Sequence, residues 1–294
     1  MEFFGISIEA LLSQLALGLV NGSFYALLSL GLAVIFGMLN IINFTHGAQY
    51  MMGAYAAWLG MHYLGINYWT ALLLCPVLVG ITGVVIERFL LRHLYRLDQL
   101  YGLLLTFGLC LIIEGLFMQW FGASGQQYPV PEQLAGVVDF TFMMLPTYRV
   151  WVVGMSLCVC LLAWAVLEKT RLGATLRAAT EKPEQTQAFG INVPLLVTVT
   201  YGFGVGLAGF AGVLAAPMIQ NTPLMGAEMI ITVFAVVVIG GMGSILGSIV
   251  TGLGLGLIEG VTKVIYPEFA SNIIFLLMVL VLLLRPSGLF GRDK

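Results

Sequence analysis

A group of polar side chains interrupts otherwise apolar stretches near the start of the chain. The amides of Asn21, Asn40 and Asn43 and the imidazole of His46 stand among leucine, isoleucine and phenylalanine. Polar groups in such surroundings either join neighbouring helices by hydrogen bonds or line the route of a polar solute. No acidic partner for a proton relay and no further metal ligand lies near His46 in the sequence. The structural and the pathway interpretations both stay open.

Two carboxylates, Glu114 and Glu259, lie within apolar runs or at their ends. Each could line a cavity or sit near a membrane interface, because an ionisable group inside a bilayer needs either a partner or water. Neither has an obvious basic partner that would suggest proton-coupled transport. Proton coupling is therefore not predicted.

Glycine is unusually frequent, with 36 residues among 294. Small residues spaced four apart, as at Gly252 and Gly256, let membrane helices pack closely. A denser group of glycines near residue 240 destabilises a helix, and a break in the helix is expected there. Broken helices at membrane depth can line transport pathways, which makes these residues pathway candidates together with the four polar residues above. The cluster consists of Gly240, Gly241, Gly243 and Ser244.

The segment from residue 169 to 193 is the most polar part of the chain. Its stretch from Ala174 to Glu181 is rich in good helix formers. Pro183 is suited to the first turn of a second short helix, and Gly190 is suited to end it. Two short amphipathic helices on the membrane surface would either dock a soluble partner or serve as a solvated connector.

The composition shows which solvent surrounds these elements. Charged residues make up 9% of the chain, against about 25% in soluble domains, and the mean hydropathy is +1.01. The apolar runs are continuous rather than alternating, which favours helices over a membrane barrel. The expected fold is therefore all-α, a polytopic transmembrane bundle that forms a single domain over residues 1–294.

Apolar runs of helical length predict eight or nine membrane spans. The count depends on whether the piece from Tyr50 to Tyr63 crosses fully. The expected spans are Leu11–Gly37, Tyr50–Tyr63, Trp69–Ile86, Leu100–Trp120, Val150–Leu167, Leu195–Met218, Met229–Ile239, Ile245–Ile258 and Ile273–Leu284.

Basic residues set the expected orientation, because cytoplasmic loops are enriched in Lys and Arg. Even numbers of spans separate the three basic clusters, so all three can face the cytoplasm, with the loop 122–147 and Lys263 outside. The side of the N-terminus stays open. The clusters are Arg88, Arg92 and Arg96; Lys169, Arg171, Arg177 and Lys182; and Arg285, Arg292 and Lys294.

Several function classes are excluded or disfavoured. A net charge of −2 with no long basic block gives no sign of a nucleic-acid partner. The four cysteines fit neither a zinc site nor a disulfide scaffold. The chain has no G-x-x-x-x-G-K-[ST] phosphate loop. It is therefore not expected to be an enzyme or to need a cofactor, and any ATP hydrolysis would take place on another polypeptide.

The motifs, taken in order, resemble one family over about 280 residues. They are Asn21-Gly22, the run from Ile35 to Gly47, Glu87-Arg88, Arg177-Ala178 with Glu181, Gly190-Ile191-Asn192, the run from Val238 to Ser244, and the tail from Leu284 to Gly291. This set is similar to the permease subunits of ATP-binding-cassette importers for branched-chain amino acids, and in particular to the shorter permease. Lys182-Pro183 departs from the pattern that many relatives show.

The resemblance implies partners and a site. The partners would be a second, different permease, two ATP-binding subunits and a periplasmic solute-binding protein, in a bacterial inner membrane. The loop 169–193 would carry a coupling helix for the ATPase. Its implied residues are Gly173, Arg177, Ala178, Glu181, Gly190 and Ile191.

Two alternatives remain. Related permeases carry urea, short amides, nucleosides or aromatic carboxylates, and the pore lining cannot be assigned from sequence. A stand-alone secondary transporter is the other class, and Glu114 and Glu259 could support it.

Overall fold

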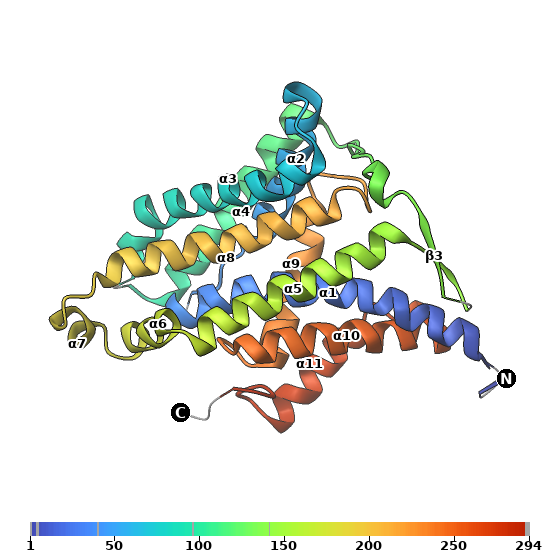
Figure 1. Cartoon of the computed structure of the whole chain (residues 1–294). Helices are drawn as coiled ribbons and strands as arrows, with labels where there is room; N and C mark the ends of the chain where they lie inside the picture. The colour runs from blue at the N-terminus through green and yellow to red at the C-terminus, as the bar shows by residue number, and fades with distance from the viewer. Residues whose placement is uncertain (1, 4–5, 40, 96, 141, 292–294) are drawn as a thin grey trace. The chain divides into compact units, whose positions relative to one another are not determined.

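The computed structural model describes residues 2–3, 6–39, 41–95, 97–140 and 142–291. Helices dominate this part of the chain (Figure 1). Six helices are long and apolar enough to cross a membrane, and two shorter apolar helices, Met225–Gly240 and Ile273–Leu284, accompany them. The chain is a multi-pass membrane protein, as its composition predicts.

The helices follow the apolar runs closely. Their bounds are α1 Ile8–Leu39, α2 Thr45–Leu64, α3 Tyr68–Phe89, α4 Gln99–Phe121, α5 Thr147–Lys169, α6 Arg171–Glu181, α7 Pro183–Ala188, α8 Val193–Ala215, α9 Met225–Gly240, α10 Ile245–Ile265 and α11 Ile273–Leu284. Short 3₁₀ turns lie at η1 Leu91–Leu94, η2 Glu132–Leu134 and η3 Pro267–Phe269.

The all-α prediction is correct for the bulk of the fold but misses two small hairpins. Strands β1 (Glu2–Phe3) and β2 (Ile6–Ser7) pair near the N-terminus. Strands β3 (Val137–Asp139) and β4 (Met144–Pro146) pair within the segment expected to be a loop. These strands have two or three residues each, which is too short to show an alternating pattern in the sequence.

The chain divides into two compact units. Unit 1 comprises Met1–Ser29, Pro129–Cys160 and Thr232–Lys294, and unit 2 comprises Leu30–Tyr128 and Leu161–Ile231. Three of the four divisions between the units fall inside α1, α5 and α9, and the fourth, between Tyr128 and Pro129, falls in the segment that joins α4 to η2. Domain boundaries usually fall in exposed linkers, whereas these divisions mostly cut through helices. The single domain over residues 1–294 stays a prediction.

Unit 2 is built on close contacts between α2, α3 and α8. A methyl group added at Gly53 would collide with the backbone of Gly209. One added at Gly80 would meet the Gly202 carbonyl oxygen at 3.0 Å. Because small residues let helix backbones approach this closely, α8 packs against both α2 and α3, as Figure 1 also shows.

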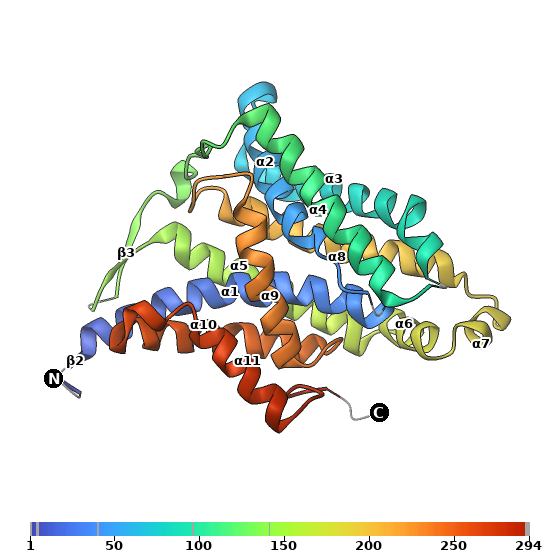
Figure 2. The same cartoon turned by 180° about the vertical axis from the view of Figure 1, so that it is seen from behind.

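Unit 1 uses the same device between α10 and the part of α1 that belongs to it. The backbone of α10 at Gly252 and Gly256 lies directly against that of α1 (Figure 2). The predicted small-residue packing at these two glycines is therefore confirmed. A buried cluster closes the unit, formed by Ala235, Val236, Ile239, Leu255 and Ile274.

Candidate functional site

The polar segment between α5 and α8 folds as two short helices. Helix α6 contains the expected stretch, and Pro183 occupies the first turn of α7. Lys182, between the two helices, has left the helical conformation at φ −139° and ψ 72°. Gly190 follows α7 with φ +83°, a value that glycine adopts without a steric penalty. The predicted helix start and end signals are confirmed.

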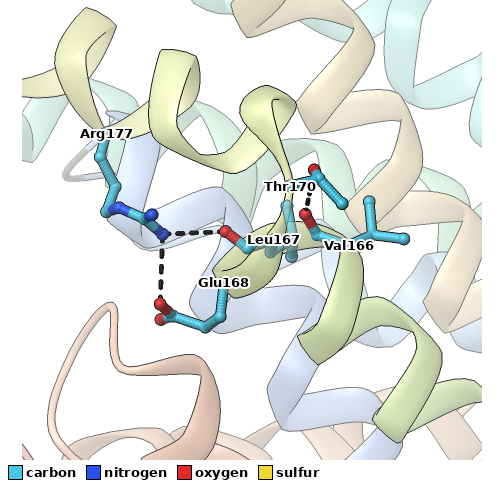
Figure 3. A network of polar contacts seen from close by, with 5 residues as sticks. All are labelled: Val166, Leu167, Glu168, Thr170 and Arg177. Atoms are coloured by element: carbon cyan, nitrogen blue, oxygen red, sulfur yellow. Dashed lines mark hydrogen bonds and ion pairs between the residues drawn. The ribbon is translucent and has the colours of Figure 1, made fainter.

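Arg177 anchors α6 to the end of α5 (Figure 3). Its Nη1 donates a hydrogen bond to the main-chain carbonyl of Leu167 at 2.8 Å and lies 3.2 Å from Glu168 Oε2. Leu167 is in the last turn of α5, where carbonyl groups lack partners within the helix. Both charged side chains are about two-fifths exposed, so the carbonyl bond matters more than the ion pair.

Gly173 makes the same junction possible, because a methyl group there would collide with the Leu167 carbonyl. Gly173 and Arg177 therefore hold the two-helix segment in place. The other residues assigned to this segment lie at its surface: Ala178, Glu181 and Gly190 are exposed, and Ile191 is half-buried.

Sequence reasoning missed the most prominent surface residue of this segment. The Phe189 side chain, between α7 and Gly190, is 85% exposed. A large aromatic residue in the most polar segment of the chain is the signal that could have found it. We call residues 171–191 the coupling segment from here on, after the role that the family resemblance implies.

The coupling segment leads directly into α8. The side chain of Asn192 accepts a hydrogen bond from the Leu195 amide at 3.1 Å and so caps the helix. Val193, the first residue of α8, is buried. The start of α8 is thus fixed relative to the preceding turn at Gly190.

A buried carboxylate on α3 contacts the first turns of α8 and was not assigned a role from sequence. Glu87, near the end of α3, is 1% exposed. Its Oε2 accepts a hydrogen bond from Thr198 Oγ1 on α8 at 2.6 Å. Its Oε1 accepts one from the Tyr95 hydroxyl at 2.6 Å. The end of α3, the turn that follows it and the distant start of α8 therefore meet at one side chain.

Tyr95 is held in its protonated form at this site. Burial, reinforced by the hydrogen bond to Glu87 and the charge of that carboxylate, raises the pKa of Tyr95 far above its ordinary value. Tyrosine is protonated at physiological pH even at its ordinary pKa, so the Tyr95 hydroxyl is a donor there.

The polar residues at the start of α2 form a second buried group in unit 2. The Thr45 hydroxyl donates to Asn43 Oδ1, and Asn43 Nδ2 donates to Gln49 Oε1 at 3.4 Å. The ring of His46 lies against Gly31, where an added methyl group would come within 2.9 Å of its Cε1. All four of these polar side chains are fully buried.

The other two polar candidates fall elsewhere. Asn21 lies on α1 within unit 1 and is half-buried. Asn40 lies outside the described residues. The structure thus brings Asn43 and His46 together at the start of α2 within unit 2, whereas Asn21 belongs to unit 1.

The glycine cluster forms the expected break between α9 and α10. Gly241 and Gly243 adopt φ values of +98° and +85°, and Ser244 caps α10 by accepting a hydrogen bond from the Gly247 amide at 3.1 Å. The C-terminal segment covers this turn: the Phe290 amide donates to the Gly240 carbonyl at 3.1 Å. Two glycine-rich motifs from distant parts of the sequence therefore pack together within unit 1.

Helix α10 continues seven residues beyond the expected end at Ile258. The reason is a charge pair within the helix, Lys263 Nζ to Glu259 Oε1 at 2.6 Å. Tyr25 on α1 donates a hydrogen bond to the other oxygen of Glu259 at 2.8 Å. Lys263 therefore lies within α10, beyond the expected end of the span, and its position on the outer side stays a prediction.

Glu114, on α4, is also buried. The thiol of Cys110, one turn earlier, donates to its Oε1 at 3.3 Å. The two intramembrane carboxylates therefore differ: Glu259 has a cation and a hydroxyl as partners, whereas a thiol contacts Glu114.

Comparison with known proteins gives a consistent result. Residues 14–282 match the family described as "Branched-chain amino acid transport system / permease component". The chain is 30% identical to the high-affinity branched-chain amino acid transport system permease protein BraD of Pseudomonas aeruginosa, over 96% of each chain. It is 27% identical to the corresponding protein LivH of Escherichia coli, again over 96% of each.

A second type of permease protein matches less completely. The chain is 26% identical to LivM of Salmonella typhimurium, over 92% of this chain and 68% of the relative. No solved structure matches the chain.

Proposed function

We propose, since the chain belongs to the family of branched-chain amino acid transport permeases, that it is one of two different permease subunits of an ATP-driven importer. The cargo would be branched-chain or other hydrophobic amino acids, as the names of its relatives suggest. Its similarity to both LivH and LivM supports a pair of related permeases, with this chain matching the full length of the LivH type.

The coupling segment is the observation that carries this proposal. It has its own two helices, it is fixed to the end of α5 through Gly173 and Arg177, and it presents an exposed Phe189. A segment fixed in this way, with an exposed aromatic residue, suits docking into a cleft of a soluble protein. Because the sequence has no phosphate loop, ATP would be hydrolysed by two separate subunits that bind the coupling segment.

The orientation follows from contacts within unit 2. The hydrogen bond between Glu87 and Thr198 places the end of α3 and the start of α8 at the same end of that unit. The basic residues Arg88 and Arg92 and those of the coupling segment therefore lie toward one side, which the excess of positive charge would make cytoplasmic.

The remaining assignments complete the importer. Eight or nine crossings result if α9, α11 and α2 are added to the six long apolar helices. A periplasmic binding protein would deliver the amino acid to the opposite face, and the complex would reside in a bacterial inner membrane. The buried polar group at the start of α2 and the turn after α9 stay candidates for the pathway.

The test is reconstitution in liposomes with radiolabelled leucine in the presence of ATP. The chain alone should give no uptake, whereas the chain with its second permease, both ATP-binding subunits and the loaded binding protein should accumulate leucine. Omitting ATP should abolish accumulation by the complete complex. Leucine accumulation by the chain alone would overturn the proposal.

A further inference from the structure

We propose that Glu87 is a positioning residue that carries movement of the coupling segment from α8 to α3. This inference rests on the proposed function, because it specifies how ATP-driven movement enters the membrane part of the protein. Its basis is the pair of 2.6 Å hydrogen bonds by which one buried carboxylate binds Thr198 and Tyr95.

The position of Thr198 makes the bond mechanically relevant. Thr198 lies only seven residues after Ile191, where the coupling segment ends, and the intervening Asn192 caps α8. A push on the coupling segment is therefore applied to the turns of α8 that Glu87 holds. No flexible linker separates the two, since α8 is helical from Val193 onward.

The hydrogen bond between Thr198 and Glu87 belongs to a strong class. A hydrogen bond to a charged group is stronger than one between neutral groups, and a carboxylate that is 1% exposed cannot exchange its partners for bulk water. Among the described residues, no lysine or arginine forms an ion pair with Glu87. The two hydroxyls are thus the hydrogen-bond partners that the described structure gives this carboxylate.

Further along the two helices, the backbones themselves are in contact. Gly206 lies against the Pro76 carbonyl and Gly202 against the Gly80 carbonyl. This packing keeps α3 and α8 together over several turns, while Glu87 secures the end nearest the coupling segment. Movement of α8 would then displace α3 and the Tyr95 segment as one body.

The test compares ATP hydrolysis with uptake in the reconstituted complex. Thr198→Val and Tyr95→Phe each remove one donor, and Glu87→Leu removes the acceptor. Each variant should lower the amount of leucine taken up per ATP hydrolysed by about tenfold. This is the effect expected when a hydrogen bond to a buried charged group is lost from one of the two conformations of the permease. Thr198→Ser keeps the hydroxyl and should restore the wild-type ratio.

Thr200→Val is the matched control. Thr200 is on the same helix and similarly buried, and its hydroxyl donates to the Leu196 carbonyl of its own helix. The Thr198 hydroxyl has the corresponding Pro194 carbonyl at 3.0 Å and, in addition, Glu87 as acceptors. This variant should keep the wild-type ratio of uptake to hydrolysis.

The outcomes separate this inference from the proposed function. If the wild-type complex shows no ATP-driven uptake, the proposed function fails. If the wild type transports and the Thr198→Val and Tyr95→Phe variants transport with an unchanged ratio, only the role of Glu87 is overturned. An equal loss of hydrolysis and uptake, with less assembled complex, would likewise reduce Glu87 to a structural residue.

Discussion

The amide of Leu289 donates a hydrogen bond to the carbonyl of Ile239 at 2.8 Å, so the C-terminal segment closes the end of α9. The last carbonyl groups of a helix have no partner within it. Here a segment fifty residues further along the chain supplies the missing donors. The two glycine-rich motifs are therefore halves of one structural junction, whatever else the turn does in transport.

Gly288→Ala should destabilise this junction. Gly288 has φ +82°, and an added methyl group would come within 2.5 Å of the Gly241 Cα. Left-handed backbone strain costs about 1–3 kcal/mol in a residue other than glycine, and the collision adds to it. We expect a lower thermal unfolding midpoint of the protein in detergent. Gly154→Ala on α5, where the methyl group meets nothing within 4 Å, should leave the midpoint unchanged or higher.

The crossing of α1 and α10 offers a sharper comparison within a single helix. A methyl group at Gly252 would lie 2.5 Å from the Ala26 amide nitrogen, whereas one at Gly254 would meet nothing within 4 Å. We expect Gly252→Ala to destabilise the protein and Gly254→Ala to stabilise it by about 0.5–1 kcal/mol through helix propensity. Chemical unfolding in mixed micelles measures both. Equal effects of the two substitutions would contradict close backbone packing at Gly252.

The sequence predicts the helices well because helix signals are local. Apolar runs locate α3 and α4 to within a few residues, and Pro183 and Gly190 mark the ends of α7. Bonds between distant segments leave no such signal. Thr198, the partner of Glu87 on α8, is 111 residues away. The sequence around Glu87 does not indicate Thr198, and the sequence around Thr198 does not indicate Glu87.

A charge pair explains the largest difference between an expected and an observed helix end, the seven extra residues of α10. A lysine and a glutamate at the end of an apolar run suggest a membrane boundary, but four residues apart they neutralise each other and let α10 continue. The predicted break at Gly241 is confirmed because its cause is local: Gly241 and Gly243 themselves adopt the positive φ values of the turn.

The Glu259–Lys263 pair should behave as a unit. Lys263→Met leaves the buried Glu259 carboxylate with Tyr25 as its remaining partner. Breaking a fully buried pair costs about 3–5 kcal/mol; because the Lys263 side chain is 38% exposed, we expect a smaller loss, about 1–3 kcal/mol. Adding Glu259→Gln should recover most of it in a double-mutant cycle. Additive losses would show that the two side chains do not interact.

Arg177 should matter through the carbonyl it binds more than through its charge pair. Arg177→Ala removes the hydrogen bond to Leu167 as well as the pair with Glu168, whereas Glu168→Ala removes the pair alone. An exposed ion pair contributes at most about 1 kcal/mol. We therefore expect Glu168→Ala to retain ATP-driven uptake and Arg177→Ala to lose most of it while inserting normally. Protease sensitivity of α6 provides an independent readout, and it should rise in the Arg177 variant.

Phe189 should contribute directly to binding of the ATP-binding subunits. Burying a phenylalanine side chain is worth about 1.5–3 kcal/mol, so Phe189→Ala should weaken the complex by roughly ten- to a hundredfold. The affinity can be measured by titrating purified ATP-binding subunits onto the permease in nanodiscs. The side chain is 85% exposed in the free chain, so its removal should leave the unfolding midpoint unchanged. Gln187→Ala, at a neighbouring exposed position of α7, is the control and should bind normally. An unchanged affinity in Phe189→Ala, with normal uptake, would mean that docking uses another face of the coupling segment.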